Sequence, residues 1–197
     1  MDKTQIFKAS INNVDIAVEA LKAGEIIVYP TDTLYGFGVD ASNDHAIKKL
    51  NKLKNRSLPL SIMISKIDDI TKYGYLSDIA NNQISKILPG PYTILLKSRN
   101  NIKISNLVQA GSELIGMRFV NIDFCNQLIN KLESPIITTS INKHGMESMS
   151  NIDDIISAFP SIKTFYDKKN LISKGSTIID FSIIPEKVIR VGEGKYL

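Results

Sequence analysis

The stretch YPTDTLYGFGVD, residues 29–40, places a dense group of polar side chains directly after the apolar run EIIV. Thr31, Asp32 and Thr33 follow the predicted end of a buried strand, and strand ends form the edge where α/β sheets usually bind ligands. Proline, threonine, aspartate and glycine are also common in ordinary turns. The segment alone therefore allows two interpretations, a ligand loop or a plain connection, and the rest of the chain has to separate them.

The composition is that of a globular protein with one substantial domain. The 197 residues are 43% hydrophobic and 22% charged, which suffices to bury a core without disulfides or metals. The single cysteine, Cys125, lies in NIDFCNQLI, which predicts a thiol on the buried face of a helix. No signal peptide is apparent, and no apolar run approaches the roughly 18 residues of a membrane span. We therefore expect a cytoplasmic protein with no membrane partner.

The charge pattern directs attention to the arginines. The formal net charge is +4, which is only a weak indication of a nucleic-acid partner. Lysine accounts for 20 of the 24 basic residues, and the four arginines are Arg56, Arg99, Arg118 and Arg190. In a chain so rich in lysine, an arginine is expected where its planar fork binds a carboxylate or a phosphate at two points.

Hydrophobic periodicity predicts an α/β domain in which helices and strands mix irregularly. The predicted helices are residues 12–24, 42–55, 78–88, 123–132 and 152–159. The predicted strands are residues 25–30, 60–64, 92–97, 115–120, 135–140, 176–180 and 187–191. No crossover helix is evident between strands 92–97 and 115–120, which indicates a partly antiparallel sheet. We expect one domain over residues 1–197, with a twisted, mixed parallel and antiparallel sheet flanked by helices.

Standard nucleotide and hydrolase signatures are absent from the sequence. The chain has no GxxxxGK[ST] P-loop and no G-x-S-x-G elbow. Its two histidines, His45 and His144, lie far apart, and no Cys/His cluster has the spacing of a metal site. We therefore expect no metal held by protein ligands.

Three further polar segments follow apolar ones, and each is weak evidence alone. LKNRSLPL puts Lys54 and Arg56 at a helix end, where a basic cap on the helix dipole is an equal alternative. TTSINKHG begins with Thr138 at the end of the strand PII, where a plain turn is as probable. GSTIID and KVIRVG place Ser176 and Arg190 at the edges of the last strands.

Taken in order, PTDTLYGFG, K-x-R, LPGPYT, GMR, TTSIN, GSTIID and IRVG resemble the YrdC family, the threonylcarbamoyl-adenylate synthases of tRNA modification. The resemblance covers roughly residues 10–193 and is specific in combination. It implies a YrdC-like fold and a nucleotidyltransferase, L-threonylcarbamoyladenylate synthase. Such an enzyme joins L-threonine, bicarbonate and ATP into threonylcarbamoyl-AMP and releases pyrophosphate. The product serves threonylcarbamoyladenosine modification at tRNA position 37, through a threonylcarbamoyl-transferase complex.

The resemblance also implies roles for the matching residues. The catalytic cations at the triphosphate would be Lys54 and Arg56. The other ATP-binding residues would be Ser140, Asn142, Ser148 and Arg190. The threonine-binding residues would be Thr33, Arg118, Thr138 and Ser176, with the Arg118 fork on the amino-acid carboxylate. Mg²⁺ is expected with ATP, held mostly by phosphate oxygens and water.

This chain departs from the family pattern at four points. The segment after Arg56 is short, and Met63 stands where relatives carry a threonine-contacting histidine. Ile141 replaces the usual alanine, and His144 a common serine. The first two departures concern the threonine contacts, and the last two concern the fit around the nucleotide.

The reaction that the resemblance implies makes chemical demands of its own, which can be stated without the family's residues. The threonine amine and bicarbonate must form a carbamate, and the carbamate oxygen must then attack the α-phosphate. Several anions share one pocket, so the site needs cations and hydroxyl or amide donors already in place. No covalent nucleophile is required.

Two alternatives remain open at this stage. The lysines of HAIKKLNKLKNR could belong to a module that holds double-stranded RNA or tRNA by phosphate contacts alone. A YrdC-fold paralogue without the threonine reaction is the other alternative. Hydroxyl and amide clusters at several strand ends favour a pocket, because an RNA-binding surface does not need them.

Overall fold

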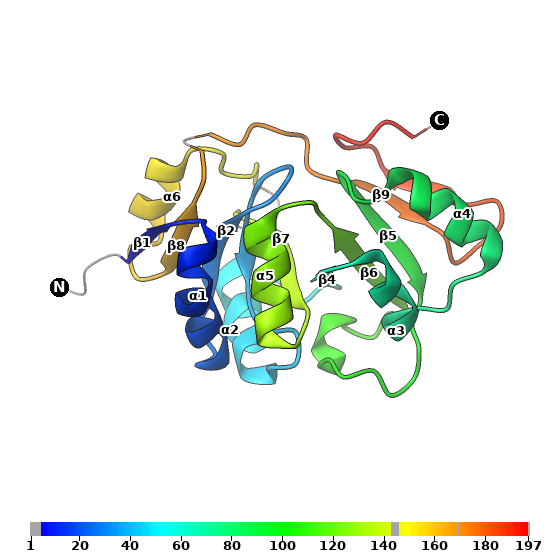
Figure 1. Ribbon diagram of the computed structural model, residues 1–197, viewed down its shortest axis with the longest axis horizontal. Coiled ribbons are helices and arrows are strands. Elements are labelled where there is room, and N and C mark those ends of the chain that lie inside the picture. The colour runs from blue at the N-terminus through cyan, green and yellow to red at the C-terminus, as the bar shows by residue number, and fades with distance from the viewer. Residues whose placement is uncertain (1–4, 143–145, 169, 197) are drawn as a thin grey trace.

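The computed structural model describes residues 5–142, 146–168 and 170–196, in which ten strands form one mixed sheet with helices on both faces (Figure 1). The strands are β1 (Ile6–Lys8), β2 (Ile27–Pro30), β3 (Tyr35–Gly38), β4 (Ser61–Ile64), β5 (Tyr92–Lys97), β6 (Leu114–Phe119), β7 (Ile136–Ser140), β8 (Lys163–Tyr166), β9 (Thr177–Asp180) and β10 (Lys187–Arg190). The α-helices are α1 (Val14–Lys22), α2 (Asp44–Lys54), α3 (Ile70–Tyr73), α4 (Asp78–Ile87), α5 (Asp123–Leu132) and α6 (Ile152–Ala158). Within these ranges, every helix is too short or too polar to cross a membrane.

The sheet order is β1-β8-β2-β3-β7-β4-β6-β5-β9-β10. Four neighbouring pairs are parallel: β1/β8, β8/β2, β4/β6 and β5/β9. The remaining neighbours are antiparallel. They include β5 and β6, the two strands between which the sequence shows no crossover helix. The prediction of a single-domain α/β fold with a mixed sheet flanked by helices is confirmed.

Strand β7 joins the two halves of the sheet. Its Thr139 lies opposite Phe37 of β3, and its Ile137 lies opposite Ile62 of β4. The strands approach closely because β3 carries Gly36, where an added Cβ would lie 3.2 Å from the Thr139 carbonyl oxygen. The carboxyl end of β7 therefore lies beside both the β2–β3 hairpin and the β4 half of the sheet.

Alternate residues of the central strands point into different cores. Val28 and Ile62 pack with α2, α4 and α6, whereas Tyr29 and Met63 pack with α1 and α5. Successive side chains of a strand face opposite sides, so the two clusters mark the two covered faces, with α1 and α5 nearer the viewer in Figure 1. Cys125 of α5 is fully buried in the second cluster, as predicted.

The ends of helix α2 are fixed by two asparagines. The Asn43 side chain accepts a hydrogen bond from the Ala46 amide at 3.0 Å, which caps the first turn. Asn55 adopts the left-handed conformation, with φ 50° and ψ 47°, and ends the helix. Because the chain turns at Asn55, Lys54 and Arg56 leave the backbone in different directions.

Three strands, β1, β3 and β8, were not predicted from the sequence. Strand β3 reads YGFG, and two glycines in four residues are more typical of a loop than of a strand. It is nevertheless fully buried between β2 and β7, because pairing on both edges outweighs the local preference. The polar group after Pro30 is consequently a tight hairpin turn over residues 31–34.

Candidate active site

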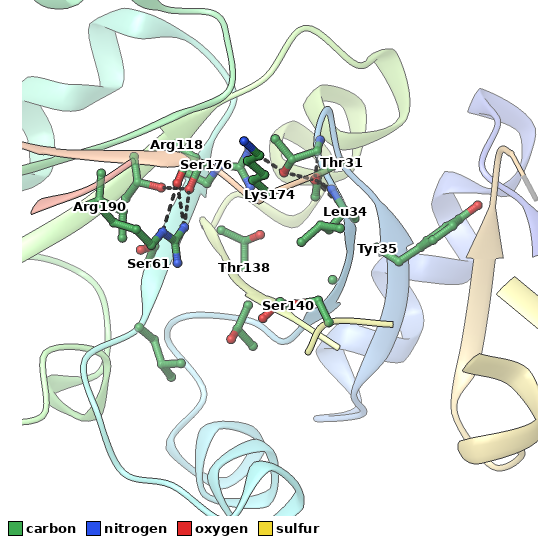
Figure 2. Close-up of a pocket in the computed structure, with 18 of the residues that line it drawn as sticks. Thr31, Leu34, Tyr35, Ser61, Arg118, Thr138, Ser140, Lys174, Ser176 and Arg190 are labelled. Carbon is green, nitrogen blue, oxygen red and sulfur yellow. Dashed lines mark hydrogen bonds between the residues drawn. The ribbon is translucent and has the colours of Figure 1, made fainter. Parts of the chain in front are cut away.

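A cavity of about 220 Å³ opens between the β2–β3 turn, the end of β7, the segment after α2 and the start of β9 (Figure 2). Three of the four arginines line it: Arg56, Arg118 and Arg190. Lys174 adds a cation, and none of the described lining residues carries a carboxylate. The remaining arginine, Arg99, lies elsewhere, 4.8 Å from the centroid of the Tyr75 ring. The cavity therefore has the charge that an anion-binding site requires.

Eight of the ten residues predicted for the site line this cavity. They are Thr33, Arg56, Arg118, Thr138, Ser140, Ser148, Ser176 and Arg190. Lys54 and Asn142 are not among the lining residues. The structure thus brings together segments that are up to 157 positions apart in the chain, from Thr33 to Arg190.

The β2–β3 turn is held rigid by its own hydroxyl groups. Thr31 Oγ1 accepts from the Thr33 and Leu34 amides, each at 3.2 Å, and donates to the Leu34 carbonyl at 2.7 Å. Thr33 Oγ1 lies 3.2 Å from Thr31 Oγ1 and is nearly buried at the cavity wall. A turn built this way presents the Thr33 hydroxyl at a fixed position.

Arg118 of β6 is buried, with 7% of its surface exposed. Its Nη2 donates to the Asp32 carboxylate, with which it forms an ion pair, and to Thr33 Oγ1 at 3.3 Å. Its Nε has no hydrogen-bond partner within the described part of the chain. Burial raises the pKa of Asp32, and the Arg118 charge opposes that rise. The guanidinium is thus anchored by Asp32 and Thr33 in the cavity wall, and not all of its five N–H donors are used.

Ser176, Thr93 and Arg190 form a second anchored group of the cavity wall. Ser176 Oγ and Thr93 Oγ1 lie 2.7 Å apart. Arg190 donates through Nη2 to the Ser176 carbonyl at 2.7 Å and to its Oγ at 3.1 Å. Burial lowers the pKa of Arg190, and the nearby Arg118 charge adds to this effect. An anion between the two arginines would relieve their repulsion.

Lys174 reaches the same wall because Gly175 bends the chain. Gly175 has φ +77°, a conformation that favours glycine, and its carbonyl accepts from the Glu193 amide at 2.8 Å. The Glu193 carboxylate in turn accepts from Ser173 Oγ at 3.1 Å. These contacts fasten the segment before β9, and within the described residues the Lys174 ammonium forms no hydrogen bond or ion pair that would neutralise it.

Arg56 lines the opposite, α2 side of the cavity. Its Nη2 donates to the Pro59 carbonyl at 3.3 Å, whereas its buried Nε has no partner among the described residues. Burial lowers the pKa of Arg56. A half-buried guanidinium with free donor capacity is suited to bind an incoming anion.

Lys54 and Asn142 lie behind the cavity wall and contact each other. Lys54 is 1% exposed, and its Nζ donates to the Ser140 carbonyl, to the Asn142 carbonyl at 3.1 Å and to Asn142 Oδ1 at 2.8 Å. Ser140 Oγ also donates to Asn142 Oδ1 at 2.8 Å. Only Ser140 of this group faces the cavity.

The departures from the family pattern fall into different environments. Met63 is fully buried in the core beneath α1 and α5 and does not line the cavity. Ile141 is also fully buried. Pro59, in the short segment after Arg56, does line the cavity, and His144 lies outside the described residues.

The lining residues that the sequence did not single out for the site include Ser61, Thr93, Thr139 and Lys174. Thr93 lies within the quoted motif LPGPYT and Lys174 is two positions before Ser176, so proximity to a motif was a usable signal for both. Ser61 lacked one. It faces the cavity because Gly116 lies opposite it on β6, where an added Cβ would be 2.7 Å from Ser61 Oγ.

The described residues include no group of three or more His, Cys, Asp or Glu side chains placed to hold a metal ion. The cavity wall offers hydroxyl groups and cations, which suit phosphate oxygens better than they suit a bare divalent ion. A Mg²⁺ ion would fit here as part of a nucleotide complex, with phosphate oxygens and water as its ligands.

A family model for the Sua5/YciO/YrdC domain, described as "Telomere recombination", matches residues 19–192. A Methanocaldococcus jannaschii protein, provisionally named threonylcarbamoyl-AMP synthase, is 36% identical over 176 residues, covering 87% of this chain and 80% of the relative.

Two solved structures share the fold. The crystal structure of E. coli YciO matches with a TM-score of 0.87 at 24% identity, covering 98% of this chain and 97% of that one. P. abyssi Sua5 complexed with L-threonine matches with a TM-score of 0.84 at 23% identity over 95% of this chain. This chain spans 57% of that Sua5 protein.

Proposed function

The chain belongs to the Sua5/YciO/YrdC family, and on that premise we propose that it is an L-threonylcarbamoyladenylate synthase, a nucleotidyltransferase. The observation that carries the proposal is the convergence of Arg56, Arg118 and Arg190 on one cavity without a lining carboxylate among the described residues. A reaction that brings bicarbonate, an amino-acid carboxylate and a triphosphate together needs such a site. The Sua5 structure with L-threonine supports threonine as the amino acid.

The threonine half of the site is the group around Arg118. Arg118 would hold the α-carboxylate, while the hydroxyls of Thr33, Thr138 and Ser176 would orient the amine and the side chain. The amine nitrogen attacks the carbon of bicarbonate, forming the carbamate with loss of water. Fixed partners on both sides of the amino acid would keep the carbamate oxygen aimed at the nucleotide.

The nucleotide half is the group around Arg56 and Arg190. These cations, with the Ser140 and Ser148 hydroxyls, would hold ATP, which enters with Mg²⁺ on its phosphate oxygens. The carbamate oxygen attacks the α-phosphorus and the bond to the β-phosphate oxygen breaks, releasing pyrophosphate. Arg56 and Lys174 would stabilise the charge that develops on the leaving group.

Pyrophosphate release tests the proposal directly. The purified protein with MgATP should release pyrophosphate only when L-threonine and bicarbonate are both present. Omission of either should reduce the rate to background. Equal release without threonine would refute the proposal, and a product of different mass would identify another acceptor.

A second candidate is a paralogue that keeps the nucleotide half but lacks the threonine reaction. The observation in its favour is the near-complete mutual coverage with YciO, together with Met63 in the core where the family resemblance places a histidine. Nucleotide binding without threonine-dependent turnover would favour this candidate.

The wider setting follows from the proposed product. Threonylcarbamoyl-AMP would be passed to a threonylcarbamoyl-transferase complex acting on tRNA in the cytoplasm. Contact with tRNA or other double-stranded RNA would use exposed lysines of α2 such as Lys48. A gel-shift titration with tRNA checks this point separately from turnover.

A further inference from the structure

The position of Lys54 differs from that of every cation that lines the cavity. Its ammonium group has three N–H donors, and all three are used by acceptors of the protein: two backbone carbonyls and the Asn142 side chain. Its side chain is buried beside Phe37, with Nζ 6.0 Å from the ring centroid. A lysine so enclosed has no donor left for a phosphate unless it abandons these partners.

All three acceptors belong to the segment 140–142 at the end of β7. This segment is tied onward as well, because Asn142 Nδ2 donates to the Met146 carbonyl at 2.7 Å. The Met149 amide donates to the Ile141 carbonyl at 2.8 Å. Lys54 therefore fastens the base of a connection that presents Ser140 at one end and Ser148 at the other.

Removal of Lys54 would leave these acceptors without a donor. A buried carbonyl that loses its partner costs free energy unless the backbone moves to reach water. The segment 140–142 is at the cavity edge, so such a movement is open to it and would displace Ser140 and Ser148. Helix α2 would retain its core contacts through Ile47 and Leu50.

We propose that Lys54 is a positioning residue, which holds Ser140 and Ser148 in place for the nucleoside part of the ligand through the segment 140–142 and does not contact the triphosphate. The proposal rests on the proposed function only in taking a nucleotide as the ligand. Lys54 and Asn142 thereby hold the segment in place, whereas Arg56 and Ser140 contact the ligand. All four residues belong to the K-x-R and S-x-N pattern.

Equilibrium binding of ATP and of adenosine separates positioning from phosphate contact. In Lys54→Met, the affinities for both ligands should fall by a similar factor, about tenfold or more, because the disturbed segment serves the part that they share. Lys52→Met is the matched control: it removes an exposed lysine from the last turn of the same helix and should change neither affinity. Loss of ATP affinity with adenosine affinity unchanged would overturn the proposal.

Amide hydrogen exchange of Met149 provides a readout without any ligand. Its hydrogen bond to Ile141 should open more often in Lys54→Met, raising the exchange rate about tenfold relative to the wild type and Lys52→Met. Unchanged exchange would refute the positioning role. If the wild type binds neither ATP nor adenosine, the proposed function fails, and the exchange measurement still decides the role of Lys54.

Lys54→Gln covers the case in which the methionine variant does not fold. Glutamine is uncharged but keeps two N–H donors for the carbonyls of the segment. Exchange at Met149 should then be moderately faster than in the wild type, because one of the three donors is lost. A glutamine variant with wild-type exchange but ATP affinity reduced as strongly as in Arg56→Ala would show that charge at the phosphates is what matters, and would overturn the proposal.

Discussion

The two walls of the cavity differ in how their cations are neutralised. On the threonine side, Arg118 is buried against Asp32, so its charge already has a carboxylate partner within the protein. On the nucleotide side, the Arg56 guanidinium forms no ion pair among the described residues and donates only to the Pro59 carbonyl. The Arg190 guanidinium likewise donates only to oxygens of Ser176 and forms no ion pair within the described chain.

This difference matches the charges of the proposed substrates. Threonine is a zwitterion with no net charge, and a wall with a paired cation and anion suits it. ATP carries several negative charges, and uncompensated cations lower the cost of bringing it out of water. The distribution of charge therefore favours threonine near Arg118 and the triphosphate near Arg56. The variants below test that division.

The largest effect is expected for Arg56→Ala. Loss of this guanidinium should lower kcat/KM for ATP at least a hundredfold, equivalent to about 3 kcal/mol of transition-state stabilisation. Thermal stability should change little, because the Arg56 side chain is half-buried and its guanidinium makes a single hydrogen bond, to the Pro59 carbonyl, within the described residues. Steady-state kinetics and a melting curve provide both measurements. Normal kinetics would instead support a basic cap on helix α2.

A smaller effect on one substrate is expected for Arg118→Lys. Lysine keeps the charge and can still pair with Asp32, but it loses the planar two-point contact with a carboxylate. The KM for threonine should rise about tenfold while the KM for ATP stays within about twofold. Saturation curves for both substrates are the measurement. If only the ATP curve moves, the division of the cavity is wrong.

A modest pH effect should be confined to the nucleotide side. Burial, with the Arg56 charge as a second cause, lowers the pKa of Lys54 to about 8. The protonated form, which supplies all three donors, predominates below that pH, and its share falls as the pH rises through about 8. Arg56 is the only charged group among the described residues that contributes to this lowered pKa of Lys54. The other groups around Lys54, Phe37 and the end of β7, are uncharged, and no described carboxylate pairs with it.

Adenosine is the appropriate probe because it has no phosphate to titrate. Its affinity for the wild type should weaken a few-fold between about pH 7 and about pH 9.5. In Lys54→Met the profile should be flat over that range. A wild-type profile as flat as that of the variant would contradict a role for the Lys54 proton in holding the segment 140–142.

The sequence indicated which residues meet, but not the direction in which each one points. Arginine in a lysine-rich chain was a valid guide, since the three arginines in motif positions do line one cavity. The K-x-R spacing could not separate Lys54 from Arg56, because their directions depend on the left-handed conformation of Asn55 between them. Strand β3 was missed for a related reason: its glycines look like a loop until β2 and β7 are placed beside it.

The smallest effect is expected for Arg99, the arginine outside the cavity. It is exposed, stacks over the Tyr75 ring at 4.8 Å and donates through Nε to the Gly74 carbonyl at 3.4 Å. In Arg99→Lys the cation can still lie over the ring, so stability should change by less than about 0.5 kcal/mol. Both KM values and kcat should stay within about twofold of wild type, because no substrate is expected to reach this position. The measurement is the same pair of saturation curves used for Arg118→Lys. A tenfold loss of activity would show that an arginine outside the cavity also matters for turnover. The division of the two walls by charge would then have to be abandoned.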